Sequence, residues 1–525
     1  MSESVLPDPP TIPRLLRQTA ARWHAHPAIE EDGETWTWGQ VETQAMTAAR
    51  ALLAHGIAHG DRVAIWAPNW REWIAAALGI HCVGAVLVPI NTRLRGAEAA
   101  DLLARSGARV LFTAGEFLGA DYPAMLARHR PAGLERLIVL RGAREGEEGW
   151  ADFLACGAEI DPAQAAALAA AIGADDLSDL MYTSGTTGRA KGVMSAHGQN
   201  LAMISHWARA MEMSGADRYL IVAPFFHSFG YKAGWLAALM HGATILPHAV
   251  FDAKRILERI ARDHVSVLPG PPTLFHSLLA EPALASTDLS SLRATVTGAA
   301  SIPPILIERM RNDLGFGIVL SAYGLTESCG FVTMSARGDA PETVARTSGR
   351  AMPGVELRLV DVAGNEVARG ERGEVLVRGV NVMHGYFEDA AATAQAIDAD
   401  GWLHTGDVGI LDADACLAIV DRLKDMYISG GFNCYPAEIE KQVAAHPLIA
   451  QAAVVGIEDA RLGEVGCAFV VLRPGAALDA PALIAWCRTQ MANYKVPREV
   501  VFVDALPVNA GGKVLKTELR SMRRA

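Results

Sequence analysis

Short apolar runs of β type alternate with Ala- and Leu-rich helical runs through the first four hundred residues of this chain, and this pattern constrains the fold most. Such alternation is typical of α/β layers built on largely parallel sheets. A chain of 525 residues is too long for one hydrophobic core, so we expect more than one domain. The clearest β-type runs are residues 62–67, 85–88, 110–113, 137–140, 219–223, 244–246, 266–268 and 294–297.

The pattern changes after residue 350. Residues 355–360 and 374–377 alternate in polarity on either side of the turn at 361–365, which predicts an antiparallel hairpin. After Asp421 a smaller unit of mixed elements follows, with helices expected at 436–444 and 480–490 and strands at 450–456 and 465–471. The chain should therefore hold a large α/β domain and a smaller α+β domain.

Composition excludes several classes of function. The net charge of −11, without any run of Lys and Arg, argues against a nucleic-acid partner. The longest apolar stretch, residues 74–90, is interrupted by His81, two glycines and Pro89, so we expect no membrane span. Seven scattered cysteines without a C-x-x-C pair indicate reduced thiols, and the start of the chain lacks a signal peptide, which together favour the cytoplasm.

The segment from Tyr182 to Gly192 has the composition of a phosphate-binding loop. It holds three glycines, four hydroxyl side chains and Lys191, so it offers backbone amides, hydroxyls and an ammonium to phosphate oxygens. It follows a strand-like run at 177–182 and precedes a helix-like run at 199–211. It is not the common P-loop, which requires G-x-x-x-x-G-K-[ST]. The loop predicts ATP chemistry outside the ordinary NTPases.

Three further segments are weak signals when taken singly. In Ser321–Ser328, Tyr323 can stack on a purine and Glu327 can hold Mg²⁺, although a Glu after a turn is usually only solvated. Asp407, after a Gly turn, can accept two ribose hydroxyls with Arg422 beside it, or the two can form a surface ion pair. Lys513, on a Gly-rich loop, can reach into a cleft, or it can belong to a basic tail.

In this order along the chain, the four segments resemble the ANL superfamily of adenylate-forming enzymes. The resemblance runs from about Arg14 to Leu519. It implies a large N-terminal domain (1–421) of layered α/β subdomains with a small β-barrel-like part, a hinge (422–425) at Lys424, and a small mobile α+β C-terminal lid (426–525). It also implies ATP, Mg²⁺ and coenzyme A as cofactor and co-substrates.

The resemblance assigns roles residue by residue. Lys513, Thr326, Glu327 and His227 match catalytic positions, with Glu327 as the metal ligand. The ATP positions are Thr183, Ser184, Gly185, Thr186, Thr187, Gly188, Lys191, Gly298, Ala299, Ala300, Ala322, Tyr323, Gly324, Asp407 and Arg422. The acyl pocket positions are His227, Phe229, Tyr231, Lys232, Ala233, Gly298, Gly324, Cys329 and Gly330. The path of CoA matches Gly430, Gly431, Phe432 and Asn433.

The implied reaction is ligation of a carboxylic acid to CoA through an acyl-adenylate, with release of pyrophosphate and then AMP. The segment 225–234 is similar to ligases for the propanoate side chain of bicyclic steroid-degradation acids, and it also fits medium- and long-chain fatty acids. His227 either assists the CoA thiol or only packs and gates the pocket. Lys232 either binds a ring oxygen or is an exposed loop lysine.

Two other functions stay open from the sequence. One is a stand-alone adenylation enzyme that loads an acyl or aryl acid onto a carrier protein; residues 235–239 offer no acidic partner for an amino acid. The other is a non-catalytic nucleotide sensor, which the intact set of charged positions disfavours. The sequence does not decide the oligomeric state and leaves a homodimer open.

Overall fold

The computed structural model describes residues 6–183, 190–298, 302–423, 425–429, 432–459, 461–491, 493–508 and 514–524, without the side chains of 432, 433 and 524. The chain forms two compact units. Unit 1 comprises Met1–Glu356 and Val377–Leu403, and unit 2 comprises Leu357–Leu376 and His404–Ala525. Unit 2 thus takes in residues before the predicted boundary at 421. The predicted hinge stays a prediction, and Lys424 lies outside the described residues.

An eight-stranded sheet forms one layer of unit 1, in the order β20-β11-β10-β4-β3-β5-β8-β9. Its central strands β10, β4, β3, β5 and β8 are parallel, while β11 and β20 run antiparallel to their neighbours at one edge. The strands are β3 (Arg62–Trp66), β4 (Val86–Pro89), β5 (Ala108–Thr113), β8 (Arg136–Val139), β9 (Glu148–Gly149), β10 (Leu177–Thr183), β11 (Lys191–Ala196) and β20 (Gly385–Tyr386).

A second layer joins two four-stranded sheets, β12-β13-β1-β2 and β14-β15-β16-β17. Val267 bridges Tyr219 on one side and Ala294 on the other, both in parallel register, and so connects them. The strands are β1 (Pro27–Glu31), β2 (Glu34–Thr37), β12 (Arg218–Ile221), β13 (Thr244–Pro247), β14 (Ala294–Gly298), β15 (Ile318–Tyr323), β16 (Thr333–Met334) and β17 (Arg350–Ala351), with a small hairpin β6 (Glu116–Phe117) and β7 (Ala120–Asp121) elsewhere.

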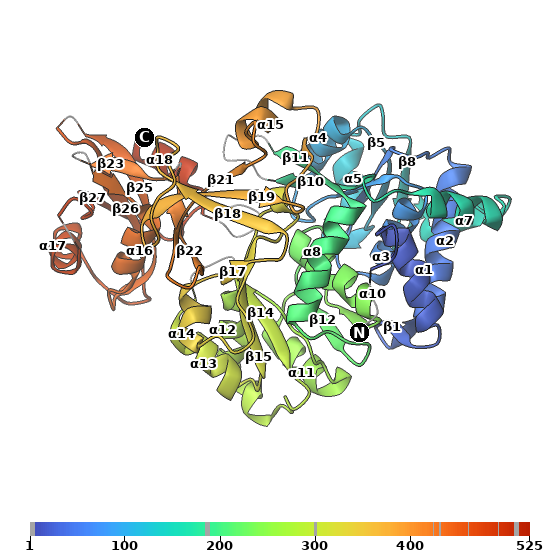
Figure 1. Cartoon of the computed structure of the whole chain (residues 1–525), viewed down its shortest axis with the longest axis horizontal. Helices are drawn as coiled ribbons and strands as arrows, with labels where there is room; N and C mark the ends of the chain where they lie inside the picture. The colour runs from blue at the N-terminus through green and yellow to red at the C-terminus, as the bar shows by residue number, and fades with distance from the viewer. Residues whose placement is uncertain are drawn as a thin grey trace. The chain divides into compact units, whose positions relative to one another are not determined.

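Helices cover both layers, and Figure 1 shows α12 and α13 beside β14 and β15. Helix α3 (Arg71–Cys82) is buried on nearly every side, as expected for a helix that is apolar all round. The other helices of unit 1 are α1 (Ile12–Arg22), α2 (Trp38–Ala54), α4 (Gly96–Ser106), α5 (Tyr122–Ala127), α6 (Trp150–Cys156), α7 (Pro162–Ala171), α8 (His197–Ala210), α9 (Ser228–Gly230), η1 (Tyr231–Leu236), α10 (Ala237–His241), α11 (Ala253–Asp263), α12 (Pro272–Ala280), η2 (Pro282–Ser286), α13 (Pro304–Asn312), η3 (Thr326–Ser328), α14 (Pro341–Arg346) and α15 (Ala390–Ala396).

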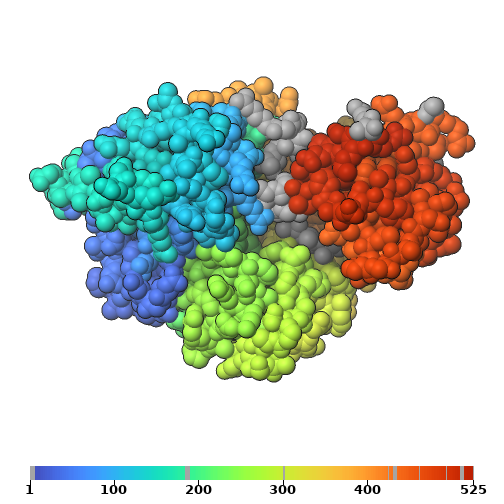
Figure 2. Space-filling model, turned by 180° about the vertical axis from the view of Figure 1, so that it is seen from behind, coloured from blue at the N-terminus to red at the C-terminus, as the bar shows by residue number. Residues whose placement is uncertain are grey.

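Within unit 1, the blue-to-cyan segment and the green-to-yellow segment each gather into a body of their own in Figure 2. The green-to-yellow body has its own core, which Leu257, Phe275 and Leu306 share with seventeen other buried side chains. Among the described residues, no helix combines the length and apolar character that a membrane crossing needs.

Unit 2 is built on a five-stranded sheet, β24-β23-β26-β25 with β27 beside β26. Tyr427, Ile439 and Leu483 belong to its core, which packs helices α16 and α17 against the sheet. Its elements are β23 (Tyr427–Ser429), β24 (Phe432–Cys434), α16 (Pro436–Ala444), β25 (Ile449–Asp459), β26 (Gly463–Leu472), α17 (Ala480–Gln490), β27 (Glu499–Phe502) and α18 (Lys516–Arg524). A further sheet has the order β18-β19-β21-β22, with β18 (Val355–Val360), β19 (Arg372–Gly379), β21 (Leu403–Leu411) and β22 (Leu417–Arg422).

The predicted mixed α/β class is confirmed, with a large N-terminal part and a small C-terminal part. One local expectation is corrected, because the segment 266–268 makes only a single bridge at Val267. The helix predicted at 199–211 is present as α8, and the structure adds strand β11 between it and the phosphate loop. The periodicity of residues 191–196 is too short to separate a strand from a helix start, so only pairing with β10 reveals the strand.

Candidate active site

Several predicted site residues lie at one edge of the second layer. Strands β12, β13, β14 and β15 are parallel, so their carboxyl ends meet there. Gly298 ends β14, Tyr323 ends β15, and His227 follows the loop after β12. The carboxyl edge of a parallel sheet is the usual ligand-binding position in open α/β folds. The structure thus brings together segments that are a hundred residues apart in the chain.

Glycines allow the loops at this edge to approach closely. A Cβ added to Gly298 would lie 2.5 Å from the carbonyl oxygen of Ala322. A Cβ on Gly324 would lie only 2.1 Å from the carbonyl oxygen of Gly330, a separation that non-bonded atoms do not tolerate. The lack of a side chain at these two positions therefore lets the backbone of Gly298 approach Ala322 and the backbone of Gly324 approach Gly330.

Strands β10 and β11 carry the phosphate loop between them. Thr183 and Lys191 face each other across the last pair of this antiparallel ladder, and Ser184, Gly185, Thr186, Thr187 and Gly188 lie outside the described residues. Along the chain, β11 stands between the loop and α8, which begins at His197. The groups predicted to bind phosphate are therefore the loop amides, the hydroxyls and Lys191.

Tyr386, which the sequence did not point out, connects Glu327 with Lys191. Its hydroxyl donates to Glu327 Oε1 at 3.0 Å, and the Lys191 ammonium lies 4.8 Å from the centre of its ring. Burial and the adjacent Glu327 carboxylate raise the pKa of Tyr386, so its phenol stays protonated. Thr326 and Glu327 form the short helix η3 directly after Tyr323. The contact spans 59 residues, and no local pattern announces it.

His227 is exposed, yet desolvation by the surrounding protein lowers the pKa of its imidazole below the ordinary value. Both observations are expected of a ring that neighbouring protein atoms surround on several sides without covering it. The backbone N–H of Phe229 donates to His227 Nδ1 at 3.1 Å. A neutral ring that accepts at Nδ1 carries its proton on Nε2, so Nε2 is a donor.

Aromatic side chains form part of the predicted acyl wall. Phe229 packs edge-on against Trp207, with ring centres 5.7 Å apart, and Trp207 in turn contacts Phe331 at 5.6 Å. Trp207 and Phe331 are buried, whereas Phe229 keeps exposed surface. Ser228 lies beside Gly330, whose added Cβ would be 3.1 Å from the Cβ of Ser228. Sequence reasoning missed Trp207 because it lies on α8, far from the motif.

Lys232 is fully buried in the π-helix η1, which excludes the exposed loop lysine that the sequence allowed. Its ammonium lies 3.1 Å from Asp179 Oδ1 and 3.2 Å from the Ser195 hydroxyl. Asp179 Oδ2 accepts from Ser178 at 2.8 Å and from Asn200 at 2.6 Å. Lys232 therefore links the helix after His227 to β10 and β11, the strands that lead to the phosphate loop.

Three other predicted pocket residues also have almost no exposed surface. Tyr231 and Cys329 are fully buried, and only 1% of Ala233 is exposed. The Tyr231 hydroxyl pairs with His81 Nε2 at 3.0 Å, and burial raises the pKa of both the phenol and the Cys329 thiol. These side chains support the wall from behind, and their contact with an acid stays a prediction.

In unit 2, Asp407 and Arg422 face each other in register across β21 and β22, with Arg422 Nε 2.9 Å from Asp407 Oδ1. The predicted ribose pair is thus side by side. Neighbouring Asp421 is buried, accepts from the backbone N–H groups of Arg422 and Ala437, and burial raises its pKa to about 6. The remaining predicted residues, namely Lys424, Gly430, Gly431, Lys513, and in unit 1 Ala299 and Ala300, lie outside the described residues, as do the side chains of Phe432 and Asn433.

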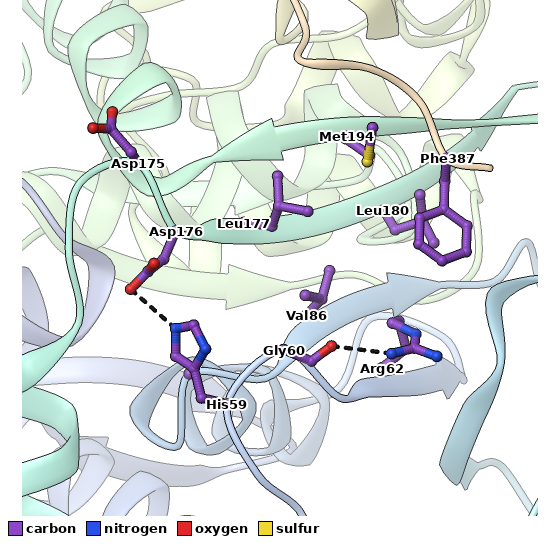
Figure 3. Close-up of a pocket in the computed structure, with 11 residues that line it drawn as sticks. His59, Gly60, Arg62, Val86, Asp175, Asp176, Leu177, Leu180, Met194 and Phe387 are labelled. Atoms are coloured by element: carbon purple, nitrogen blue, oxygen red, sulfur yellow. Dashed lines mark hydrogen bonds and ion pairs between the residues drawn. The ribbon is translucent and has the colours of Figure 1, made fainter. Parts of the chain in front are cut away.

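A cavity of about 300 Å³ lies away from this set (Figure 3). Its floor is apolar, with Val86, Leu180 and Phe387 among the lining side chains, and at its rim His59 pairs with Asp176 at 3.1 Å. None of the predicted site residues lines it. It flanks the starts of β3, β4 and β10, opposite to the ends that carry the phosphate loop.

Residues 16–387 match the family model of the AMP-binding enzymes, and residues 438–513 match the C-terminal domain of these enzymes. The chain belongs to the AMP-binding enzyme family. Family membership across both segments confirms the resemblance to the ANL superfamily. ATP fits this family as a substrate. Gly298, Tyr323 and Glu327 lie at one sheet edge. The sequence assigned these residues to nucleotide and metal binding, and an ATP-using family is consistent with that prediction.

Two relatives cover nearly the whole chain. A protein of Mycobacterium tuberculosis is 50% identical over 513 residues, 98% of this chain and 99% of its own, and is named a 3-(7a-methyl-1,5-dioxo-octahydro-1H-inden-4-yl)propanoyl:CoA ligase. A protein of Rhodococcus jostii with the same name is 47% identical over 523 residues, 98% of this chain and 99% of its own. A crystal structure of the anthranilate CoA ligase AuaEII with anthranoyl-AMP matches with a TM-score of 0.85 and 28% identity, over 99% of each chain.

The enzyme class predicted from the sequence, an AMP-forming acyl-CoA ligase, is therefore confirmed. Loading of a carrier protein is not favoured, because these relatives are named CoA ligases.

Proposed function

We propose that this enzyme ligates CoA to a bicyclic, ring-bearing propanoic acid of the octahydroindene-dione type. The observation that carries the proposal is the identity of 50% and 47% to two relatives named for this acid, each covered over 99% of its length. The alternative is a medium- or long-chain fatty acid, which the segment after His227 also fits. A rigid bicycle needs a wide pocket, whereas a fatty chain needs a long one.

The described wall favours the ring system. Phe229 offers an aromatic face backed by Trp207, and Gly330 has no side chain to narrow the space opposite Ser228. Flat aromatic surface next to small residues suits a fused bicycle, which buries much area without losing chain entropy.

In the first half-reaction, the carboxylate attacks the α-phosphorus of ATP and pyrophosphate leaves. The acid is already ionised at neutral pH, since carboxylic acids titrate near pH ~4, so this step needs no general base. Its difficulty is the approach of an anion to a polyanion, and positioned cations meet that difficulty. We assign this work to Lys191 on the phosphates and to Lys513, which the resemblance places between the carboxylate and the α-phosphate.

Glu327 fits the predicted magnesium site. One of its carboxylate oxygens accepts from Tyr386, which leaves the second as a hard oxygen ligand of the kind that Mg²⁺ prefers. When bound, the ion would neutralise phosphate charge. Thr326, next to it on η3, would donate its hydroxyl to a phosphate oxygen.

In the second half-reaction, the CoA thiol, whose pKa is ~8.5 in water, loses its proton to solvent; the thiolate then attacks the acyl carbonyl and AMP leaves. His227 donates from Nε2 in its neutral form, as the hydrogen bond from Phe229 to Nδ1 requires. We therefore propose that it orients the acyl group by donating to an oxygen, in place of removing the thiol proton. The predicted rotation of the C-terminal lid about Lys424 would exchange Lys513 for the CoA path between the two halves.

A reaction that consumes ATP and CoA, together with seven free cysteines, supports the cytoplasm as the place of action. A homodimer stays open, and light scattering coupled to size exclusion measures it directly.

The experiment is a panel of acids assayed for CoA-dependent AMP release, with the indanedione propanoic acid, a bile-acid-like acid, an aryl acid, and fatty acids of medium and long chain. The proposal expects the bicyclic acid to give the highest kcat/KM, by about tenfold or more, equal to ~1.4 kcal/mol of transition-state binding. A higher value for any fatty acid would replace the proposal by the alternative. If the enzyme released pyrophosphate with the acid but released no AMP when CoA was added, the result would instead favour the carrier-loading function.

A further inference from the structure

Tyr386 contacts two charged side chains, those of Glu327 and Lys191. Among the described residues, neither Glu327 nor Lys191 forms an ion pair; each instead contacts Tyr386, one through the hydroxyl and the other through the ring face. A half-buried carboxylate and a half-buried ammonium that contact the same tyrosine can each still take a ligand group of opposite charge. A metal complex of a polyphosphate supplies both.

The segment that carries Tyr386 is held firmly on two sides. Its neighbour Met383 donates its backbone N–H to the carbonyl oxygen of Glu327 at 2.9 Å, and Phe387 donates to the carbonyl oxygen of Gly192 at 2.7 Å. Tyr386 itself pairs with Val193 in the β20–β11 ladder. The segment therefore connects η3 to the strand that begins with Lys191. A ring fixed in this way keeps a constant spacing between the two charged side chains.

We propose that Tyr386 is a positioning residue that holds Glu327 and Lys191 on either side of the metal–polyphosphate group of ATP. Its hydroxyl occupies Oε1 of Glu327 and leaves the other oxygen for the metal. Its ring face holds the Lys191 ammonium by a cation–π contact until a phosphate oxygen accepts from it. The inference rests on the proposed ATP chemistry, and it assigns a role that neither the phosphate loop nor the Glu327 segment supplies alone.

Two substitutions separate the two contacts. Tyr386→Phe removes only the hydroxyl, so it should release Glu327 while the ring still faces Lys191. Tyr386→Leu removes both contacts. Tyr122→Phe is the matched control, because it deletes a tyrosine hydroxyl that donates to the carbonyl oxygen of Thr92 at 2.8 Å in another part of unit 1.

The test is calorimetric titration of ATP into the full-length enzyme, with Mg²⁺ and with EDTA, together with the Mg²⁺ dependence of acid-dependent pyrophosphate release. Removal of a group that orients a metal ligand typically weakens metal binding by about 10- to 100-fold. We expect Tyr386→Phe to raise the half-saturating Mg²⁺ concentration by about that factor and to leave the ATP affinity in EDTA unchanged. Tyr386→Leu should weaken ATP binding in EDTA as well. Tyr122→Phe should match the wild type in both.

An unchanged Mg²⁺ dependence in Tyr386→Phe would overturn the inference. Equal weakening of ATP binding with and without Mg²⁺ would also overturn it, because that result is expected if Tyr386 has only a structural role. A double variant with Glu327→Gln should be no worse in Mg²⁺ dependence than Glu327→Gln alone, and an additive loss would also overturn it. Failure of the proposed function looks different: the wild-type enzyme itself would then release no pyrophosphate with any acid of the panel.

Discussion

Replacement of Lys232 by methionine would test whether this lysine supports the fold or reads the substrate. Methionine keeps the unbranched apolar stem and removes the ammonium. In the structure Lys232 and Asp179 are both fully buried, with Nζ 3.1 Å from Oδ1 and 3.2 Å from the Ser195 hydroxyl. The variant therefore leaves the Asp179 carboxylate buried with only its bonds from Ser178 and Asn200.

Removal of one partner from a buried ion pair costs about 3–5 kcal/mol, because the remaining charge stays away from water. At about 2 °C per kcal/mol for a large domain, the expected loss is ~6–10 °C in the melting temperature of unit 1. The double variant Lys232→Met with Asp179→Asn removes both charges and keeps an amide for the neighbouring polar groups. It should recover at least ~2 kcal/mol of that loss, which a double-mutant cycle measures as coupling.

Thermal and urea unfolding, followed by tryptophan fluorescence, measure the stability of the three variants. In parallel, kcat/KM is measured below the melting transition for the bicyclic acid and for a fatty acid. Because Lys232 has no exposed surface, we expect both values to fall together, with their ratio within about twofold. A variant of wild-type stability that loses activity only on the ring-bearing acid would refute the structural role and restore Lys232 as a substrate-binding residue.

Four other predictions follow from single contacts. His227→Gln, which keeps a donor near the Nε2 position, should retain more thioesterification of a supplied acyl-adenylate than His227→Ala, for which the loss of a donor costs about 10²–10³-fold. Because desolvation lowers the pKa of His227, the wild-type rate should not fall on the acid side near pH ~6.5. A fall in rate there that is absent from His227→Gln would indicate that His227 is a general base. Gly324→Ala should destabilise the enzyme by ~1–3 kcal/mol or more in urea unfolding, because the added Cβ would clash with the backbone of Gly330. Gly133→Ala is the control, since its Cβ would meet nothing within 4 Å. Equal effects of the two substitutions would contradict the close contact between Gly324 and Gly330. Burial raises the pKa of Asp421 in the folded state to about 6, so its ionisation opposes folding progressively from about pH 4 to pH 6 and fully above. Relative to Asp421→Asn, the wild type should therefore lose ~1 kcal/mol of unfolding free energy between pH 5 and pH 8. A constant difference in unfolding free energy between the two proteins would show that the pKa is not raised. Asp407→Ala should raise the KM for ATP by about tenfold or more through the lost ribose acceptor, and an unchanged KM would remove the ribose assignment.

The sequence by itself determined the fold class and the family, and it predicted the nucleotide-site segments, which stay predictions. The reason is that each of these depends on local composition. Short apolar runs of β type and helical runs alternate along the chain, and a loop rich in glycine, threonine and lysine has few uses other than phosphate binding. The helices predicted at 436–444 and 480–490 coincide with α16 and α17, because proline near each start and apolar spacing along each helix leave little ambiguity.

Only the tertiary structure decided which side chains meet. Tyr386 contacts Glu327 across 59 residues of chain, and Lys232 on helix η1 contacts Asp179 on strand β10, yet no periodic pattern in the sequence indicates either pair. The same holds for strand β11, which exists because β10 offers it a hydrogen-bonding edge. Contacts between distant segments depend on packing and on the exclusion of water, and both arise only once the layers have assembled. The sequence thus predicted the enzyme class, and the packed layers determined which charged side chains contact one another and which are buried.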